Sequence, residues 1–338
     1  MNLLIADIGG TNARFAFQKR NKDNINFINY YRCKDYHKID DAIEYYIKKN
    51  KLKVDNMALS IAGPCNDNYV SFSNNHWWFE KIKLSKKFNV KSLLVVNDFV
   101  AQAFAFENFF KLNKSNYSKN LLEKYKIKLI KDGIPVENTN LLVTGPGTGL
   151  GVCTLTKANN IVVPIAGEGG NVNFSPQNKI EIELLKFLLN ENNYVSTEDV
   201  VSGRGLENIH KFLQYKNNKM FNKLDAKQIG NLALKNYELS QESIKLMLSI
   251  FGTSVSNNIL TNGCQKGVII AGGIISKLRY FLYKSDFFKN LINKGGYKKY
   301  LDNVPIFLAY EDHNGLIGCL NCYYNKYFAK FKTILDNK

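Results

Sequence analysis

The chain opens with Leu3-Leu4-Ile5-Ala6-Asp7-Ile8-Gly9-Gly10-Thr11, an apolar run that ends in a glycine turn. A second apolar run, 141–143, is followed by the turn Gly145-Pro146-Gly147-Thr148-Gly149-Leu150-Gly151. Glycine has no Cβ, so the backbone of such turns can approach a polyanion closely, and exposed N–H groups then form an anion-binding concavity. Two such turns, far apart in the sequence, could bind one phosphate chain from both sides. They favour an enzyme that acts on a nucleotide.

The composition predicts a folded protein of two domains, or of one domain with two lobes. The chain has 338 residues, of which 45% are hydrophobic, and it includes 22 Phe and 19 Tyr, enough for a large core. Its formal net charge of +17 raises the question of nucleic-acid binding. The lysines are scattered and accompany abundant Asn, Ile, Phe and Tyr, which is typical of an A/T-rich codon bias. We therefore expect a solvated basic surface that attracts anionic nucleotide, and no nucleic-acid partner.

The sequence carries no signal of export or of a membrane span. The N-terminal residues lack a charged leader, and no run of about 18 apolar residues occurs, so we expect no membrane association and a cytoplasmic location. The six cysteines are spread along the chain, as expected for free thiols in a reducing compartment. Cys319 and Cys322 match C-x-x-C, but without a second pair or a nearby His we expect packing and no metal site.

The hydrophobic pattern alternates between strands and helices. Strands are predicted at 3–6, 13–18, 25–32, 57–61, 93–96, 141–143, 152–156, 161–163, 268–271 and 305–309. Helices are predicted at 40–49, 99–110, 180–189, 206–215, 226–236, 242–261 and 315–328, and 111–131 is interpreted as a surface insertion. This alternation predicts an α/β protein, and the first strands are too close for crossovers, so the sheet is mixed. Because strand–glycine turn–strand occurs twice, we expect a duplicated α/β unit with both turns facing one ligand.

Five segments, in order, carry a resemblance to a known family. They are 6–14, 95–103, 144–151, 268–274 and 314–319, and they accompany a G-E-G-G segment. On these residues the chain resembles the bacterial glucokinases of the non-ROK type, within the hexokinase/actin/Hsp70-like ATPase superfamily. The resemblance implies a two-lobed actin-like ATPase (ribonuclease H-like) fold with mixed sheets and an interlobe cleft. It implies a small lobe, 1–108 plus about 312–330, and a large lobe, 109–311, that holds the adenosine site.

The resemblance also implies a reaction, which is transfer of the γ-phosphoryl group of MgATP to the 6-hydroxyl of glucose in glycolysis. Phosphate would contact Ala6, Asp7, Ile8, Gly9, Gly10, Thr11, Gly147, Thr148 and Gly149, and adenosine would contact Gly272 and Gly273. Asp7 would hold Mg²⁺ through a water molecule. Ordinary hairpin turns are the alternative for each glycine motif alone. P-loop and Rossmann sites are disfavoured, because no G-x-x-x-x-G-K-[ST] occurs and Leu150 stands where G-x-G-x-x-G needs its third Gly.

By resemblance Asp98 is the predicted general base, since phosphoryl transfer to an alcohol needs a group that accepts the hydroxyl proton. It follows a strand and opens a helix, so a helix N-cap is the alternative. By resemblance the sugar-binding residues are Asn74, Asn97, Asp98, Glu168, Asn171 and Glu198. For Glu198 the alternative is a capping box with 195–197. Trp77 and Trp78 are expected in the core.

One position departs from the family pattern, which has a His after G-E-G-G where this chain has Asn171. A shifted hexose preference, or a weakened sugar- or nucleotide-sensing regulator, is therefore the alternative function. Polyphosphate stays open as a donor, and hydrolysis of the exopolyphosphatase type is disfavoured by Glu168 and Glu198. The zinc-binding cysteine cluster of the ROK kinases is missing, so no structural zinc is expected. The expected partners are glucose and ATP, with a homodimer as the candidate assembly.

Overall fold

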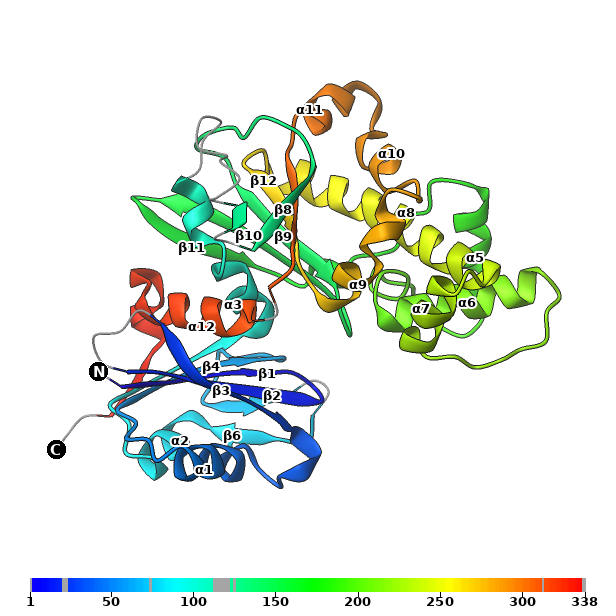
Figure 1. The fold of residues 1–338 in the computed structure, drawn as a ribbon. Coiled ribbons are helices and arrows are strands. Elements are labelled where there is room, and N and C mark those ends of the chain that lie inside the picture. Colours follow the sequence, from blue (N-terminus) through cyan, green and yellow to red (C-terminus); the bar gives the residue numbers. More distant parts are fainter. Residues whose placement is uncertain are drawn as a thin grey trace. The chain divides into compact units, whose positions relative to one another are not determined.

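The chain forms two compact units. The structure, a computed structural model, describes residues 2–19, 24–72, 75–111, 122–123, 126–311 and 313–335. Unit 1 contains Met1–Lys111, Lys157–Pro164 and Glu311–Lys338, and unit 2 contains Leu112–Thr156 and Ile165–Tyr310 (Figure 1). The lobes expected from the sequence, 1–108 with about 312–330 and 109–311, remain a prediction. The units differ from them chiefly in grouping Lys157–Pro164 with the first.

The first sheet is mixed and lies in unit 1. Its strands are β1 (Leu3–Ile8), β2 (Asn12–Gln18), β3 (Ile25–Arg32), β4 (Asn56–Ile61), β7 (Ser92–Asn97) and β14 (Thr333–Ile334), in the order β14-β7-β4-β1-β2-β3. Strands β1, β4 and β7 are parallel, and β4 is buried along its whole length, as expected for a parallel strand covered on both faces. Helices α3 (Asp98–Phe104) and α12 (Asn314–Tyr324) cover one face, and α1 (Ile39–Lys49) and α2 (Lys81–Lys87) cover the other (Figure 1).

The second sheet is also mixed. Its strands are β8 (Ile127–Lys131), β9 (Leu141–Pro146), β10 (Leu150–Ala158), β11 (Ile161–Ala166), β12 (Gly267–Ile270) and β13 (Ile306–Ala309), in the order β11-β10-β9-β12-β13-β8. The helices of unit 2 are α5 (Lys179–Leu189), α6 (Gly203–Lys216), α7 (Ala226–Leu234), α8 (Glu238–Asn262), α9 (Gly273–Leu282), α10 (Phe287–Ile292) and α11 (Lys298–Asp302).

The two sheets repeat one topology. Strand β1 pairs antiparallel with β2 across the first glycine turn and parallel with β4 on its other side. Strand β9 does the same with β10 and β12. The predicted repetition of a strand–turn–strand unit is therefore confirmed, as is the α/β class with mixed sheets.

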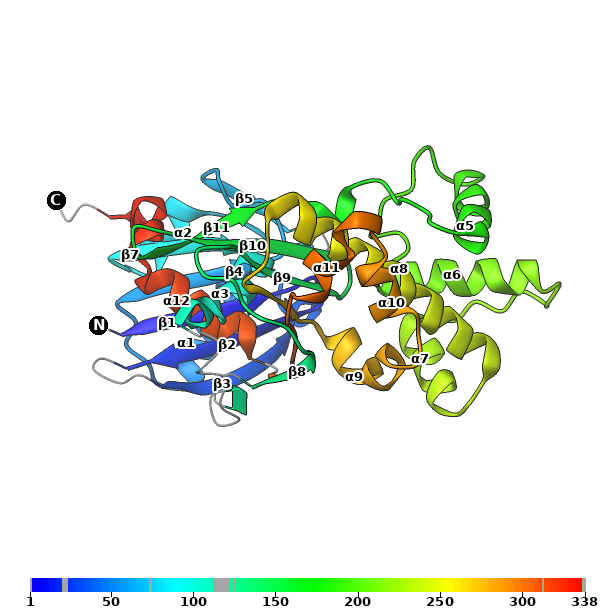
Figure 2. The ribbon, with the colours of Figure 1, turned by 90° about the horizontal axis from the view of Figure 1, so that it is seen from above.

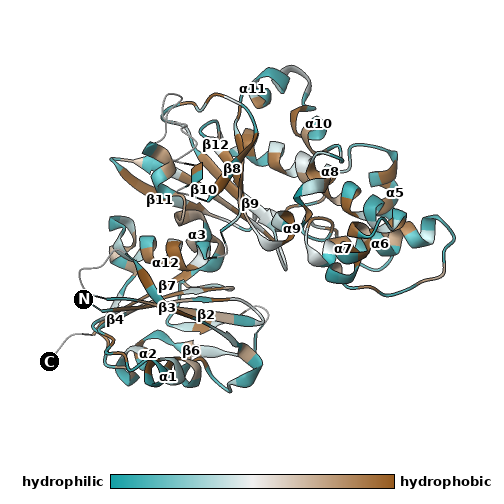
Figure 3. Ribbon diagram, viewed as in Figure 1, coloured by the Kyte–Doolittle hydropathy of each residue, from teal (hydrophilic) through white to brown (hydrophobic). Residues whose placement is uncertain are grey.

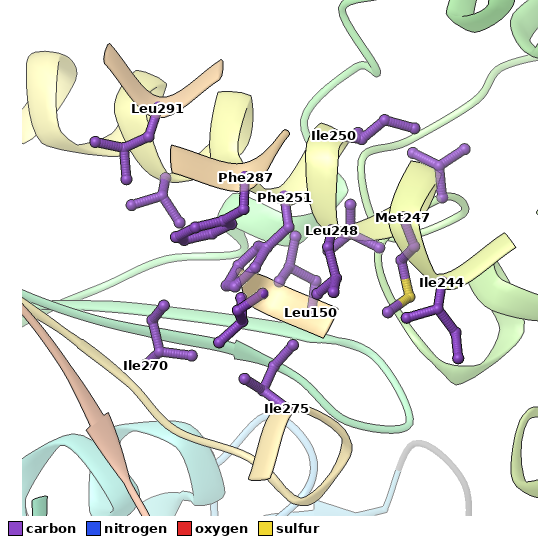
Figure 4. Close-up of a cluster of buried hydrophobic side chains, with 14 of the residues drawn as sticks. Leu150, Ile244, Met247, Leu248, Ile250, Phe251, Ile270, Ile275, Phe287 and Leu291 are labelled. Atoms are coloured by element: carbon purple, nitrogen blue, oxygen red, sulfur yellow. The ribbon is translucent and has the colours of Figure 1, made fainter. Parts of the chain in front are cut away.

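Each unit has its own hydrophobic core. In unit 2 the core centres on α8, whose Leu248 and Phe251 are fully buried and pack in one cluster with Ile270 and Phe287 (Figure 4). Helices α8 and α10 lie side by side, as both ribbon views show (Figures 1 and 2). Hydrophobic residues follow the strands and the helix faces next to them (Figure 3). These cores give each sheet a rigid edge from which loops can project.

Several boundaries differ from the sequence-based expectation. The helix predicted at 99–110 ends at Phe104 and is followed by a 3₁₀ turn at Glu107–Lys111, and the one predicted at 315–328 ends at Tyr324. The insertion predicted at 111–131 is wrong at its end, where residues 127–131 form β8, and 112–121 and 124–125 lie outside the described residues. The elements missed were β5 (Tyr69–Ser71), β6 (Trp78–Glu80), β14, α2, α9, α10 and α11.

The tandem tryptophans differ from each other in burial. Trp77 is 1% exposed, as expected for the core, whereas Trp78 is 49% exposed and stacks on Tyr69 across the β5–β6 hairpin. Consecutive side chains of an extended segment point to opposite faces, so one of the pair had to face outward. The core prediction for Trp78 is therefore wrong.

The cysteines are free thiols, and five of them are buried, including Cys319 and Cys322. Packing is therefore their role in α12, as expected. Within the described ranges, no cluster of three or more His, Cys, Asp or Glu side chains could hold a metal ion. No helix in the described part of the chain is both long and apolar enough to cross a membrane.

Gly318 sets the spacing of α12 and α3. A Cβ at this position would lie 1.5 Å from the carbonyl oxygen of Ala101, which is backbone and cannot swing away. We expect Gly318→Ala to lower the free energy of unfolding by about 1–3 kcal/mol through overpacking, measured as a lower thermal midpoint. Gly230→Ala in α7 is the control, because its Cβ would meet nothing closer than 3.7 Å. Equal midpoints for the two variants would contradict the prediction.

Candidate functional site

Three parallel strands bring the first glycine turn and Asp98 to one edge of the first sheet. Ile8 of β1 is in register with Ile61 of β4, and Ile61 is in register with Asn97 of β7. The residues that follow these strands therefore meet at the carboxyl edge, where α/β sheets bind ligands. They include Gly9 and Asp98, two of the residues predicted from the sequence.

Asp7 is held on both sides by its strand neighbours. Its register partners are Ser60 on β4 and Arg14 on β2. The Ser60 hydroxyl donates to Oδ1 at 3.3 Å, and Arg14 Nη1 pairs with Oδ2 at 3.3 Å. Burial raises the pKa of Asp7 above its usual value, and the Arg14 charge and the Ser60 hydrogen bond partly oppose that rise. Such a poorly solvated carboxylate fits the predicted role of holding a cation or its water shell.

Gly315 makes room for this carboxylate. A Cβ at Gly315, in the first turn of α12, would lie 2.4 Å from Asp7 Oδ2.

A series of polar contacts extends from Arg14 across the sheet. The Arg14 guanidinium lies 5.7 Å from the centroid of the Tyr30 ring. The Tyr30 hydroxyl is 3.2 Å from His313 Nδ1. The sequence reasoning missed Ser60, Arg14, Tyr30 and His313. Arg14 could have been found, since residues 7 and 14 lie at matching distances on either side of the turn.

Asn97 is the N-cap of α3, so the cap alternative for Asp98 is wrong. Asn97 Oδ1 accepts from the N–H groups of Phe99 at 2.9 Å and Val100 at 3.1 Å. Asp98 is the first residue of the helix, and its Oδ1 accepts from the Phe99 N–H at 2.8 Å. Asn97 therefore caps the helix, and the Asp98 carboxylate is oriented at the first helical position by the Phe99 amide.

The Cys65 thiol interacts electrostatically with Asp98, and the buried Lys81 contacts the Cys65 backbone. The Lys81 ammonium donates to the carbonyl oxygen of Cys65 at 2.6 Å, and burial lowers the pKa of Lys81. Burial raises the pKa of the Cys65 thiol, the Lys81 charge opposes this, and the Asp98 carboxylate adds to the rise. Cys65 thus belongs to the electrostatic surroundings of the predicted base, and the Lys81 charge acts on Cys65. No motif in the sequence pointed to either residue.

Each glycine turn uses one glycine amide internally. The Gly9 N–H donates to the carbonyl oxygen of Asn12 at 3.0 Å, and the Gly147 N–H donates to that of Gly149 at 2.7 Å. These two amides are therefore used within their own turns, and the contact of Gly9 and Gly147 with phosphate stays a prediction. For an anion at these turns, the amides of Gly10 and Thr11 in the first turn and of Thr148 and Gly149 in the second would be the candidate donors.

Glu198 contacts the second glycine turn directly. Its Oε2 accepts from the Leu150 N–H at 2.8 Å, and a Cβ on Gly149 would lie 2.3 Å from the same oxygen. Its Oε1 lies 3.4 Å from Nη2 of Arg204. The capping-box alternative for Glu198 is wrong, because α6 is capped by Ser202, whose hydroxyl accepts from the Gly205 N–H.

The G-E-G-G loop is built onto the same turn. The Glu198 N–H donates to the Gly170 carbonyl oxygen at 2.8 Å, and a Cβ on Gly170 would lie 2.2 Å from the carbonyl oxygen of Leu150. The Asn171 N–H donates to the carbonyl oxygen of Glu168 at 2.9 Å, and both side chains are exposed. Glu168, Asn171, Glu198 and the second turn are therefore one constellation in unit 2. Asn74, also predicted to bind sugar, lies outside the described residues.

The predicted adenosine turn, Gly272 and Gly273, lies beside the second glycine turn. Strands β9 and β12 are parallel neighbours, and a Cβ on Gly272 would lie 2.9 Å from the Pro146 carbonyl oxygen. Gly272 has φ 116, which other residues rarely adopt. Conversely, a Cβ on Gly145 would lie 1.5 Å from the Ala271 carbonyl oxygen. The structure thus brings Gly272 and Gly273 together with the Gly147–Gly149 turn.

The remaining predicted residues differ in accessibility. Ala6 and Ile8 are fully buried in β1, so they support the first turn through packing. Thr11, Thr148 and Gly273 are exposed. Gly9, Gly10, Gly147, Gly149 and Gly272 are half-buried.

Comparison with known proteins gives one family over nearly the whole chain. The family model described as Glucokinase matches residues 4–326. The chain is 32% identical to the glucokinase of Hahella chejuensis over 325 residues, which cover 96% of this chain and 97% of that one. A crystal structure of glucokinase from an Antarctic psychrotroph matches with a TM-score of 0.79 at 29% identity, covering 95% of this chain and 98% of the other.

A more distant structure shares the fold. It is a ROK family glucokinase from Streptomyces griseus in complex with glucose and AMPPNP, with a TM-score of 0.62 at 16% identity. The match covers 94% of this chain and 98% of that chain.

Neighbouring glycines in the adenosine turn give a matched test of its geometry. Gly272→Ala places a Cβ at φ 116 and 2.9 Å from the Pro146 oxygen, whereas Gly273→Ala meets nothing within 4 Å. We expect Gly272→Ala to cost about 1–3 kcal/mol in backbone strain and to weaken nucleotide binding. Gly273→Ala should keep the stability. Thermal melts and calorimetric titration with ATP measure both effects, and equal behaviour of the variants would argue against the assigned geometry.

Proposed function

This chain belongs to the glucokinase family, and we propose that it transfers the γ-phosphoryl group of ATP to the 6-hydroxyl of glucose, which gives glucose 6-phosphate. The observation that carries the proposal is the match to glucokinases along nearly the full chain. A sensing regulator or a kinase of shifted specificity, suggested by Asn171, is not favoured by these matches.

For the fold we infer a two-lobed ATPase of the actin type, with ligands bound in the cleft between the lobes. The repeated sheet topology supports this, because each sheet presents a glycine turn after the strand that pairs both antiparallel and parallel. In this proposal one turn contributes from each lobe. The phosphate chain would contact Gly10 and Thr11 in the first lobe and Thr148 and Gly149 in the second.

Asp98 is proposed as the general base. It opens α3 at the carboxyl edge of the first sheet, and the hydrogen bond from the Phe99 N–H to Oδ1 orients the carboxylate. Asp98 would accept the proton of the 6-hydroxyl as that oxygen attacks the γ-phosphorus and the bond to ADP breaks. General-base catalysis of this kind contributes roughly 10²–10⁴ in rate. The rest comes from positioning and charge stabilisation, as in other phosphoryl transfers.

The sugar would be bound by polar side chains from both sheets. Asn97 uses Oδ1 to cap α3, so its Nδ2 is the group proposed to donate to a sugar oxygen. Glu168 and Glu198 would accept from sugar hydroxyls, and a carboxylate can accept up to about four hydrogen bonds. Glu198 therefore keeps capacity for the sugar beside its bond to Leu150. Asn171 is proposed to contact the sugar as donor and acceptor, and Asn74 completes the proposed set.

Asp7 is the proposed holder of Mg²⁺, through a water molecule. When bound, MgATP supplies the transferred phosphoryl group and the cation that neutralises its charge. The residues present fit this role, because Asp7 lies directly before the first turn and its carboxylate is shaped by Ser60, Arg14 and the space left at Gly315.

For the setting of the reaction we propose the cytoplasm. The support is the set of free thiols, five of them buried, which suits a reducing compartment. A homodimer remains a prediction from the sequence.

A coupled assay of ADP release with a panel of hexoses tests the function. We expect ATP-dependent turnover with glucose above the other hexoses, and no comparable turnover when polyphosphate replaces ATP. Release of phosphate without a sugar acceptor would favour hydrolysis instead. Sugar binding without any turnover would favour a regulator.

Asp98→Asn tests the base. We expect kcat to fall by roughly 10²–10⁴ while glucose affinity, measured by calorimetry, changes little. Asp35→Asn is the matched control in unit 1, since Asp35 pairs with Arg32 at the surface, at 2.9 Å. An Asp98→Asn enzyme with normal kcat would remove Asp98 from the proposed role.

The raised pKa of Asp7 predicts a pH dependence of Mg²⁺ use. A raised pKa means that Asp7 takes up a proton at a higher pH than an ordinary carboxylate, and the protonated form holds cations poorly. The KM for Mg²⁺ should therefore rise as the pH is lowered, starting above the usual carboxylate range. Ser60→Ala removes a hydrogen bond that lowers this pKa, so the rise should begin at a higher pH. Identical Mg²⁺ profiles for both enzymes would speak against Asp7.

A further inference from the structure

Arg204 stands out among the cations of unit 2, because fixed carboxylates hold it next to the second glycine turn. Its Nη2 lies 2.9 Å from Asp199 Oδ1 and 3.4 Å from Glu198 Oε1, and its side chain is 61% exposed. Asp199 is itself anchored, since its Oδ2 accepts from the Ser196 N–H at 2.9 Å and from the Ser196 hydroxyl at 2.7 Å. Arg204 is therefore positioned rather than freely solvated.

The backbone next to Arg204 contacts the second glycine turn and lies near Ile274, which follows Gly272 and Gly273. The Gly203 N–H donates to the Gly147 carbonyl oxygen at 2.9 Å. A Cβ at Gly203 would lie 3.8 Å from Cδ1 of Ile274, the residue after the adenosine turn. Glu198 adds a second link, because the carboxylate that pairs with Arg204 also accepts from the Leu150 N–H.

The chemistry of this arrangement suits phosphate. A guanidinium is a planar fork that binds phosphate oxygens through parallel hydrogen bonds. Both ion pairs of Arg204 use Nη2, and among the described residues no acidic group pairs with Nη1 or Nε. Exposed ion pairs of this kind contribute little free energy. A multiply charged phosphate chain can therefore compete for the guanidinium.

We propose that Arg204 binds the phosphate chain of the nucleotide at the Gly147–Gly149 turn. This rests on the proposed function and adds a side-chain cation to a turn that otherwise offers main-chain amides. The Gly147 N–H already donates to Gly149 within the turn, so this amide is not offered to an anion. A cation beside the turn replaces part of that anion-binding capacity. Arg204 would then contact the substrate itself, with Glu198 and Asp199 as its positioning residues.

Calorimetric titration of the full chain with ATP, ADP and adenosine tests this proposal. Arg204→Gln should weaken ATP binding about tenfold, the value of a lost charge-assisted hydrogen bond, and should leave adenosine binding unchanged. Arg204→Lys keeps the positive charge but lacks the planar guanidinium. Its affinity for ATP should therefore lie between those of the wild type and Arg204→Gln. Lys211→Gln is the matched control, because Lys211 lies on the same helix in a surface pair with Glu191 at 2.6 Å, and it should bind ATP normally.

The outcomes separate this inference from the proposed function. A wild-type chain that binds no ATP and phosphorylates no glucose defeats the proposed function and this inference with it. A wild-type enzyme that turns over glucose, with Arg204→Gln and Arg204→Lys both binding ATP normally, overturns only the role of Arg204. Equal loss of ATP and adenosine binding also overturns it, since that pattern means a structural role. Should Arg204→Gln fail to fold, Arg204→Lys provides the test. A lower ratio of ATP affinity to adenosine affinity than in the wild type supports the proposal, and an unchanged ratio overturns it.

Discussion

The proposed site depends on main-chain contacts that leave no room for a Cβ. In unit 2, the close approach of Gly145 to the Ala271 oxygen and of Gly272 to the Pro146 oxygen brings the two turns side by side. In unit 1, Gly315 lets the Asp7 carboxylate lie against the start of α12. Any side chain at these positions would push apart backbone or a functional carboxylate. The glycines thus set the positions of the polar groups before any ligand is bound.

Both units place a carboxylate and an arginine beside a glycine turn. Asp7 pairs with Arg14 at 3.3 Å, and Glu198 pairs with Arg204 at 3.4 Å. Burial raises the pKa of the Asp7 carboxyl, and the Arg14 charge opposes that rise. An arginine at each place limits the negative charge next to a proposed phosphate position. Without it, an acidic side chain near a polyanion would oppose binding through charge repulsion.

The sequence predicted the elements with a strong local pattern and missed several short ones, such as β5, β6 and α11. Both glycine turns and the repeated strand–turn–strand unit were predicted correctly, because they are short-range signals. The cap of α3 was ambiguous, since Asn and Asp are equally good caps and stand next to each other at Asn97 and Asp98. The partners of Glu198 could not be predicted, because Leu150 lies 48 residues away in the chain.

The roles of the site residues remain proposals, and the sequence could not supply their geometry. Nothing in the motif showed that Gly147 uses its amide inside its own turn. The same holds for Arg204, whose importance follows only from contacts with Glu198 and Asp199. A motif specifies residue types and their spacing. Whether a group can bind a ligand depends also on which hydrogen bonds the group already makes within the folded protein.

Asp98 and Glu198 illustrate two ways of holding a carboxylate for such a reaction. The hydrogen bond to Asp98 Oδ1 comes from an amide of its own helix and involves neither glycine turn. Glu198 is bound to the amide that follows the second turn, so a shift of that turn moves the carboxylate with it. A base must keep one orientation through the reaction, whereas a sugar ligand gains from moving with the phosphate site. On this reasoning, the independent carboxylate suits proton transfer, and the shared one suits alignment of sugar and nucleotide.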